Sequence, residues 1–146
     1  RAMDSVATTC DGETSEIWSK GGGVIIYEVN TGKIIEQKIL ELDGYVNQVY
    51  KTGQHYLILY NNSHVALYEN DKVVLNAKLS GPISYAEWSE SEQGWHIAGW
   101  RELLFLSTTK QNRIPLQEIA VFIDGDTGLY LCNNGHWDII DAQEEE

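Results

Sequence analysis

The sequence predicts an all-β fold of antiparallel meander repeats, and the simplest version is a small, irregular four-bladed β-propeller. A strand-turn-strand phrase returns about every 35 to 40 residues, and a fixed period of this kind is typical of repeat architectures. Short strands separated by turn residues fill most of the chain, and no segment shows sustained helical periodicity. A barrel or sandwich is the alternative, because its strands come at a similar spacing. The clearest copies of the phrase cover 53–68, 94–106 and 128–140.

The first repeat covers residues 16–42 and contains a hairpin. Strands are expected at 24–29 and 33–39, on either side of Asn30-Thr31-Gly32, where the glycine can adopt a positive φ. A leading strand is missing from this repeat unless residues 5–9 supply it.

The second repeat covers residues 45–79 and is the most complete. Turn-forming residues separate its strands, including Asn61-Asn62-Ser63 and Asn70-Asp71-Lys72. A four-stranded meander of this kind is one blade of a propeller. Its strands are expected at 46–50, 56–60, 65–69 and 73–78.

The third repeat covers residues 83–119 and the fourth covers 120–140. Residues 83–91 could form a single helical turn, and Ser89 to Gly94 are expected to form a polar loop. The fourth repeat stops after its third strand. Propellers commonly complete such a blade with a strand from the other end of the chain, which residues 1–15 could supply in part.

These boundaries predict a single all-β repeat domain over residues 16–142. The N-terminal segment 1–15 is expected to be partly a processed start and partly a blade-completing strand, and residues 143–146 form an acidic tail. A chain of 146 residues is long enough to bury a hydrophobic core.

The chain has a formal net charge of −12, from 22 acidic and 10 basic residues. This excess argues against nucleic-acid binding, because phosphate backbones would be repelled. It would attract a basic partner, although solubility alone would also account for it. No apolar run is long enough to span a bilayer, and any export signal is expected to have been removed already.

Cys10 and Cys132 lie near opposite ends of the chain. If the N-terminal segment completes the last blade, the two cysteines become neighbours and a disulfide could lock the ring. A bridge closing so long a loop would stabilise the fold by about 4 to 5 kcal/mol. Two buried thiols are the alternative and the default in a reducing compartment, but the even count and terminal placement favour the bridge.

No constellation in the sequence predicts catalysis, a metal site or a cofactor. A nucleophile elbow, a phosphate loop and a zinc-spaced cluster are all missing from the sequence. His64 and His136 follow equivalent turns and could converge on a metal, but the repeated turn itself accounts for their positions. The segment Asp124 to Gly128 is expected to be a hairpin turn, because it lacks the further acidic ligands of a calcium loop.

Tryptophans beside two loops are the best candidates for contacting a protein partner, because such residues are common anchors of interfaces. For any single tryptophan, packing in the core is the competing role. The expected binding residues are Trp88, Ser89, Glu90, Ser91, Glu92 and Trp95 around the first loop, and Trp18, Ser19, Lys20, Gly21 and Gly22 around the second.

The segment from Cys10 to Val24 reads Cys-Asp-Gly-Glu-Thr-Ser-Glu-Ile-Trp-Ser-Lys-Gly-Gly-Gly-Val, and 17–22 carry its strongest similarity. It resembles a stretch in periplasmic immunity proteins that neutralise peptidoglycan-cleaving amidase effectors of the type VI secretion system. The resemblance covers about a tenth of the chain and carries over no inhibitory residue. It implies a small β-rich fold, export to an oxidising compartment and inhibition by plugging.

These observations predict a non-enzymatic inhibitor, an immunity protein that blocks a bacterial effector enzyme with its loops. Its expected location is the periplasm or the outside of the cell, and a cytoplasmic location stays open. The alternatives are a carbohydrate- or ligand-binding β-repeat module and a segment of a larger propeller scaffold. No cofactor is expected.

Overall fold

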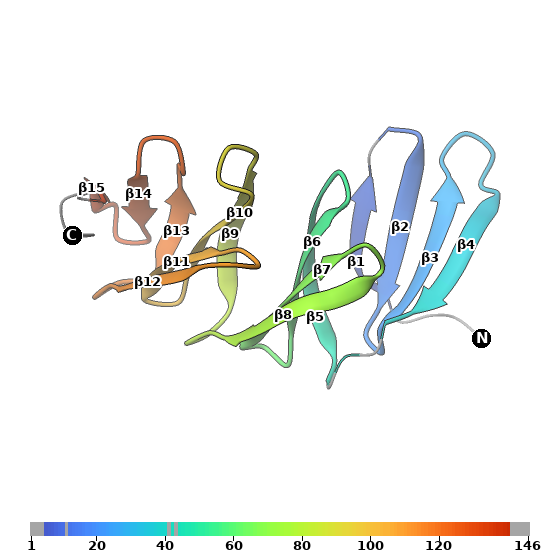
Figure 1. Ribbon diagram of the computed structural model, residues 1–146, viewed down its shortest axis with the longest axis horizontal. Helices are drawn as coiled ribbons and strands as arrows, with labels where there is room; N and C mark the ends of the chain where they lie inside the picture. The colour runs from blue at the N-terminus through green and yellow to red at the C-terminus, as the bar shows by residue number, and fades with distance from the viewer. Residues whose placement is uncertain (1–4, 11, 41, 43, 141–146) are drawn as a thin grey trace. The chain divides into compact units, whose positions relative to one another are not determined.

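The computed structural model describes residues 5–10, 12–40, 42 and 44–140, and for 5–10 it describes the backbone only. The chain forms two compact units, Arg1–Ala77 and Lys78–Glu146, where the sequence predicts one repeat domain over 16–142. Figure 1 shows the sheets of each unit, and the regular structure of the described residues is entirely β-strand.

The first unit holds two four-stranded antiparallel meanders, each in chain order. Its first sheet consists of β1 (Ser5–Cys10), β2 (Thr14–Ser19), β3 (Gly23–Glu28) and β4 (Ile34–Ile39). Its second sheet consists of β5 (Val46–Thr52), β6 (His55–Tyr60), β7 (His64–Glu69) and β8 (Lys72–Lys78). Because β1 pairs with β2, the N-terminal strand leads the first sheet and does not complete the last one.

Two hairpin turns of the second sheet have the conformation that their asparagines predict. Asn61 and Asn62 have φ of 50° and 64°, and Asn70 and Asp71 have φ of 52° and 63°. Two successive residues at positive φ form the turn whose twist suits adjacent antiparallel strands, and Asn and Asp tolerate this region best after glycine. These turns fix the register of β6, β7 and β8.

The core of the first unit lies between its two sheets, where β5 packs beside β1 and β2. Trp18, Val24, Val46 and Ile58 are almost completely buried there. The central strands β6 and β7 are buried over most of their length, whereas the outer strand β4 is mainly exposed. This gradient from buried inner strands to an exposed outer strand is expected for a propeller blade.

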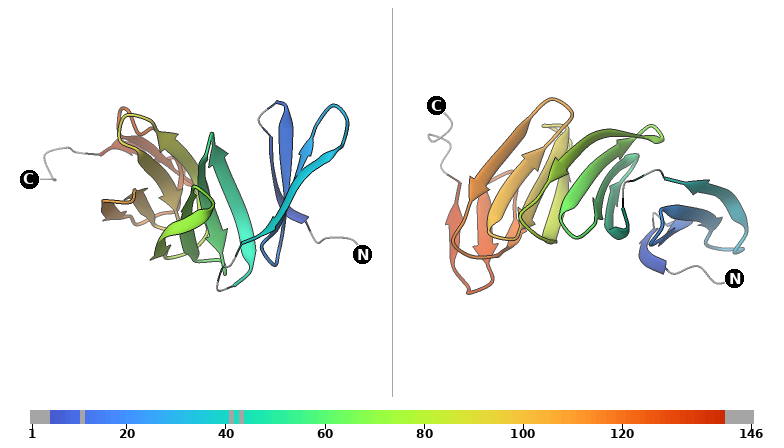
Figure 2. Two further views of the ribbon diagram at one scale, coloured as in Figure 1. Left: turned by 45° about the vertical axis from the view of Figure 1, so that its right-hand side comes forward. Right: turned by 90° about the horizontal axis from the view of Figure 1, so that it is seen from below.

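The second unit also holds two sheets, which Figure 2 shows from two further sides. The first consists of β9 (Ile83–Ser89), β10 (Gly94–Gly99), β11 (Glu102–Leu106) and β12 (Gln111–Pro115). The second consists of β13 (Ala120–Ile123), β14 (Leu129–Cys132) and β15 (Trp137–Ile139). The last sheet has three strands within the described residues, as the sequence predicts, but the helical turn suggested for 83–91 is wrong, because this segment is strand β9 paired with β10.

The core of the second unit lies between these two sheets, where β13 packs beside β9 and β10. Ala98, Leu103, Ala120 and Ile123 are each at most 1% exposed. Each unit therefore has a hydrophobic core between its own two sheets. The four sheets share no strand within the described residues, so the structure agrees with propeller-like blades and not with a single closed barrel.

The predicted disulfide between Cys10 and Cys132 is not formed, because Cys132 carries a free thiol that is 2% exposed. The side chain of Cys10 lies outside the described residues. Burial raises the pKa of the Cys132 thiol, and the nearby charge of Glu118 raises it further. Cys132 is therefore a packed, protonated core residue.

Candidate functional site

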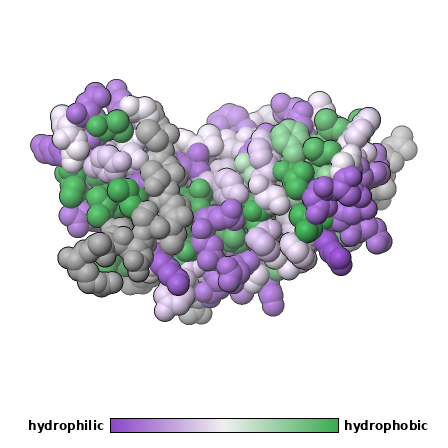
Figure 3. All heavy atoms as spheres, turned by 180° about the vertical axis from the view of Figure 1, so that it is seen from behind, coloured by the Kyte–Doolittle hydropathy of each residue, from purple (hydrophilic) through white to green (hydrophobic). Residues whose placement is uncertain are grey.

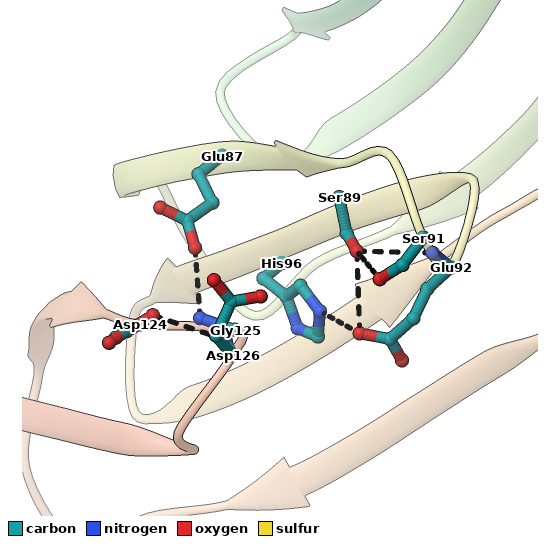
Figure 4. A network of polar contacts seen from close by, with 8 residues as sticks. All are labelled: Glu87, Ser89, Ser91, Glu92, His96, Asp124, Gly125 and Asp126. Carbon is teal, nitrogen blue, oxygen red and sulfur yellow. Dashed lines mark hydrogen bonds and ion pairs between the residues drawn. The ribbon is translucent and has the colours of Figure 1, made fainter.

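The loop between β9 and β10 is a compact turn held together by its own side chains, as Figure 4 shows. The Ser89 hydroxyl accepts a hydrogen bond from the Glu92 amide at 3.2 Å and lies 3.3 Å from the Ser91 hydroxyl. The Gln93 amide donates to the Ser89 carbonyl at 2.8 Å, and Gln93 has a positive φ of 54°. A short loop with this many internal bonds is ordered before it meets a partner.

Glu92 and His96 form the polar pair at the centre of this region. His96 Nε2 lies 2.8 Å from Glu92 Oε1, so the two side chains form a hydrogen bond, and an ion pair when the histidine is protonated. The His96 ring also packs against Phe105, with 4.9 Å between ring centroids. The histidine is mostly buried and Glu92 is half-exposed, so one oxygen of Glu92 can reach solvent or a partner.

A second turn is fixed against the same histidine. The Gly125 amide in the β13–β14 hairpin donates to Glu87 Oε1 at 2.8 Å, and the Tyr85 hydroxyl donates to Glu87 Oε2 at 3.0 Å. A Cβ at position 125 would lie 2.3 Å from His96 Cδ2, so glycine is required for the backbone to approach this closely. The turn Asp124–Gly128 closes as predicted, with the Gly128 amide donating to the Asp124 carbonyl.

Beside these turns, the second unit contains a cavity of about 80 Å³ between its two sheets. Its walls are mainly apolar and come from strands β10 to β13 and from Ile140, while charged and amide side chains form its rim. The lining residues are Glu92, His96, Leu103, Leu104, Phe105, Lys110, Asn112, Ile114, Ile123 and Ile140. The ammonium group of Lys110 lies 5.9 Å from the centre of the Phe105 ring.

The structure places part of the first predicted loop at this cavity and corrects the rest. Glu90, Ser91 and Glu92 are exposed, and Glu92 lines the cavity. Ser89 is buried and holds the turn. Trp95 is 1% exposed, so it is a core residue and not an interface anchor.

Trp88 is half-buried and supports the turn from one side. Its indole N–H donates to Glu90 Oε2 at 2.9 Å, and its ring packs edge-on against Trp95 with 5.7 Å between centroids. It therefore buttresses the loop, and only part of its surface is available to a partner.

The second predicted loop is held within the core of the first unit. Trp18 is fully buried, so the expectation that it anchors a partner is wrong, and its indole N–H donates to Glu16 at 3.1 Å. Gly22 is buried too, and a Cβ there would lie 2.6 Å from the Leu40 carbonyl oxygen. The Ser19 hydroxyl accepts a hydrogen bond from Gly23, which leaves Lys20 and Gly21 as the exposed part of this loop.

A groove of about 330 Å³ opens beside the β7–β8 hairpin of the first unit. Its walls are formed by Ile39, Leu40, Tyr68, Asp71, Lys72 and Val73. At its edge, Lys38 Nζ lies 3.0 Å from Asp71 Oδ1 and 5.6 Å from the centre of the Tyr68 ring. Burial alone would lower the pKa of Lys38, but the hydrogen bond to Asp71 and the nearby charges of Tyr68, Asp71 and Glu36 together outweigh it and raise the pKa. The single aromatic ring of the groove is thus already covered by a cation.

The described residues contain no group of three or more metal-ligating side chains. His64 stacks beside Tyr60, with 5.5 Å between ring centroids, and His136 is exposed in a turn of the other unit. Among the described residues there is also no helix that is long and apolar enough to cross a membrane.

Sequence reasoning identified the loop of this site but not its cavity. Asn112 and Ile114 belong to the outer strand β12, whose sequence has the alternating pattern of an ordinary edge strand. Lys110 directly precedes β12, and Ile140 follows the last short strand. The sequence signal for this wall is the alternation in β12, because the apolar residue Ile114 faces β13 while its neighbours in the strand face solvent. Ile114 becomes part of a cavity wall only when the two sheets are packed together.

In sequence comparisons, no protein family and no curated protein matches this chain. Among solved structures, it is similar to the β-propeller domain of Cps50 (Swd1) from Myceliophteria thermophila, with a TM-score of 0.71 and 17% identity over 100% of this chain and 55% of that one. It is also similar to the Pan2 WD40 domain of Neurospora crassa, with a TM-score of 0.64 and 14% identity over 95% of this chain and 47% of the other.

The computationally designed Ika4 protein is similar in length as well as structure. Its TM-score is 0.68 at 7% identity, over 94% of this chain and 91% of the designed one. The chain spans about half the length of the two natural propeller domains above. These likenesses show that the chain has a β-propeller-like fold.

Proposed function

We propose that this chain is a non-enzymatic protein-binding module whose second unit receives an aliphatic side chain of its partner. The observation that carries this proposal is the size and lining of the cavity. Pockets for small molecules usually have volumes of roughly 300 to 1,000 Å³. A cavity of about 80 Å³ is too small for such a ligand, but it can hold the end of one aliphatic side chain.

The rim of the cavity suits the backbone that would carry this side chain. The Asn112 amide can both donate to and accept from a peptide group, while Lys110 and the outer oxygen of Glu92 offer charged contacts. An apolar pocket with polar groups around its mouth is typical of the sites that receive the anchor residue of a protein interface. The net charge of −12 further favours a partner with basic residues.

Hydrogen bonds within the first turn and from the second turn to strand β9 order the two turns beside the cavity, which lowers the entropy lost on binding. The similarity to WD40 propeller domains supports a protein-interaction scaffold, and a segment of a larger propeller scaffold was one of the alternatives to the inhibitor. Inhibition of a bacterial effector enzyme in the periplasm is a narrower form of the same proposal, and it adds that the bound partner loses activity.

Carbohydrate binding in the groove of the first unit has less support. Sugar sites usually offer an exposed aromatic face, but Tyr68, the aromatic residue of the larger groove, is 4% exposed. The lysine over its ring occupies the position that a sugar would need.

The proposal can be tested with a displayed library of random peptides and two neighbouring substitutions. Asn112 and Gln111 are adjacent, exposed residues of β12 whose side chains point to opposite faces, and of the two only Asn112 lines the cavity. Asn112→Trp should cover the cavity mouth and weaken selected peptides by about tenfold or more, whereas Gln111→Trp should leave their affinity unchanged. Peptides that lack an aliphatic anchor, or that bind both variants equally, would contradict the proposal.

A further inference from the structure

The last sheet of the second unit ends in an open edge. Within the described residues, the other three sheets have four strands each, whereas β13, β14 and β15 form a sheet of three. The side of β15 that faces away from β14 is therefore not paired with a strand in the part of the chain that the structure describes. An edge of this kind can accept a further strand.

Hydrogen bonds on either side of β15 show which of its backbone groups face the edge. The Ile140 amide donates to the Gly128 carbonyl at 2.9 Å, and the His136 carbonyl accepts from the Cys132 amide at 2.7 Å. Because inward and outward groups alternate along an antiparallel strand, the backbone groups of Trp137 and Ile139 face the edge. The Ile139 amide donates instead to the adjacent Asp138 carboxylate, at 2.8 Å.

An exposed apolar row runs across the same sheet. Phe122, Leu131 and Trp137 are register partners on successive strands, so their side chains lie on one face. They are 36%, 37% and 62% exposed, and Ile139 on the same face is 53% exposed. Hydrophobic residues at the molecular surface are coloured green in Figure 3. A row of this kind next to an open edge offers side-chain contacts as well as backbone bonds.

In two of the three complete sheets, the fourth strand carries a cation that pairs with an acid. Fourth strand β4 carries Lys38, which pairs with Asp71 at 3.0 Å. Fourth strand β12 carries Arg113, which pairs with the buried Glu102 at 2.7 Å. Each of these strands thus carries one cation that neutralises an acid outside the strand, either in the β7–β8 turn or on the adjacent strand β11. At the open edge, Asp138 of β15 is the acid with which an incoming cation would pair.

We propose that β15 accepts, as an antiparallel fourth strand, an extended segment of a partner protein in which apolar residues alternate with lysine or arginine. The apolar residues lie opposite Trp137 and Ile139 and extend the exposed row. A cation lies opposite Asp138 and draws its carboxylate away from the Ile139 amide, which then donates to the incoming strand. The acidic net charge of the chain favours this segment over a second copy of itself. This surface is separate from the cavity, because Trp137 and Ile139 point to the opposite face from Ile140.

A short peptide of alternating valine and lysine is a direct probe. In the proposed pairing the valines lie opposite Trp137 and Ile139, so valine N–H groups bond to the edge and lysine N–H groups point away. A peptide with N-methylated lysines should bind as the parent does, and one with N-methylated valines should lose about tenfold or more in affinity. On binding of the parent peptide, hydrogen exchange of the Ile139 amide should slow by about tenfold. Equal affinity of the two N-methylated peptides, or unchanged exchange at Ile139 under saturation, would overturn the proposal.

Two matched charge changes test the role of Asp138. Asp138→Lys should weaken the valine–lysine peptide by about tenfold, whereas Asp126→Lys, the same change at another exposed acid of this unit, should alter affinity by less than about twofold. Asn112→Trp should have no effect here, which separates this edge from the cavity. A chain that sediments as a dimer, and that Trp137→Glu converts to a monomer, would instead assign the edge to a second copy and refute a basic partner strand.

Discussion

The hydroxyl of Tyr56 in β6 donates a hydrogen bond to the carboxylate of Glu16 in β2 and thereby joins the two sheets of the first unit. Glu16 Oε2 also accepts from Lys51 Nζ at 3.2 Å, and Oε1 accepts from the Trp18 indole at 3.1 Å. The Glu16 side chain is 3% exposed, so this carboxylate is a charged group inside a hydrophobic core. These hydrogen bonds and the ion pair with Lys51 compensate for the loss of hydration.

Glu16→Ala is expected to destabilise the chain by about 3 to 5 kcal/mol, because it leaves the ammonium group of Lys51 buried without its carboxylate. Chemical denaturation followed by circular dichroism measures the change. Glu36→Ala, which removes an exposed carboxylate from the same sheet, should shift the unfolding free energy by less than about 0.5 kcal/mol. Similar effects of the two substitutions would show that the buried network is not a main source of stability.

The same contact makes stability depend on alkaline pH. Burial raises the pKa of Tyr56 well above its ordinary value, and the hydrogen bond and charge of Glu16 raise it further. Since the folded-state pKa exceeds the unfolded value of about 10, this contribution is fully present below about pH 10 and is lost as pH rises further.

Above about pH 10, the unfolding free energy should therefore fall with a contribution of about 1.4 kcal/mol per pH unit from Tyr56. Tyr56→Phe should show a shallower decline, although it is less stable at neutral pH by about 1 kcal/mol. Part of the remaining slope in this variant comes from Tyr50, Tyr68 and Tyr85, whose pKa values burial also raises. Cys132 and Lys38, whose pKa values are raised as well, add to it. Denaturation at a series of pH values measures both slopes, and parallel curves would exclude a special role for Tyr56.

The repeat pattern was sufficient to predict most of the strands, because turn residues carry strong local information. Gly32, Asn61 and Asn70 each adopt a positive φ where the sequence places a turn. An exception is 83–91. This run contains few turn residues, so its sequence is compatible with a helical turn, but it forms a strand because it pairs with β10. Long-range pairing, which no local pattern contains, set the outcome there.

The binding site was harder to predict, because burial of a tryptophan depends on what the neighbouring sheet contributes. Trp18 and Trp95 lie next to loops in sequence, but each points inward along its strand. The cavity joins Glu92, from a loop that the sequence identified, to Ile123 and Ile140, which lie far along the chain. A sequence places such residues on a face of a strand, and only the packing of two sheets brings the faces together.

The state of the cysteines can be read from thiol titration. Under denaturing, non-reducing conditions we expect both of the 2 cysteines to react with a thiol reagent, whereas the disulfide that the sequence favoured would leave none reactive. In folded Cys10→Ser, Cys132 should react at least about tenfold more slowly than in the unfolded chain, because it is buried and its raised pKa keeps it protonated. Rapid labelling of the folded variant would contradict the burial of Cys132.

The Glu87–Gly125 hydrogen bond should determine how well the cavity of the second unit is preformed. Glu87→Ala removes the acceptor of the Gly125 amide, so this turn is free to move away from His96, and the pair between His96 and Glu92 loses its support. We expect a loss of about 1.5 to 3 kcal/mol in stability and faster hydrogen exchange at Gly125.

Asp126→Ala is the matched control, because it removes an equal charge next to Gly125 but leaves the Gly125 amide bonded to Glu87. Glu87→Gln keeps a side-chain oxygen as acceptor and should lie between the two. Peptides selected for the cavity should dissociate faster from Glu87→Ala than from Asp126→Ala, since a mobile rim must be ordered again at each binding event. Equal dissociation rates would show that the cavity keeps its shape without this bond, and its walls alone would then account for its rigidity.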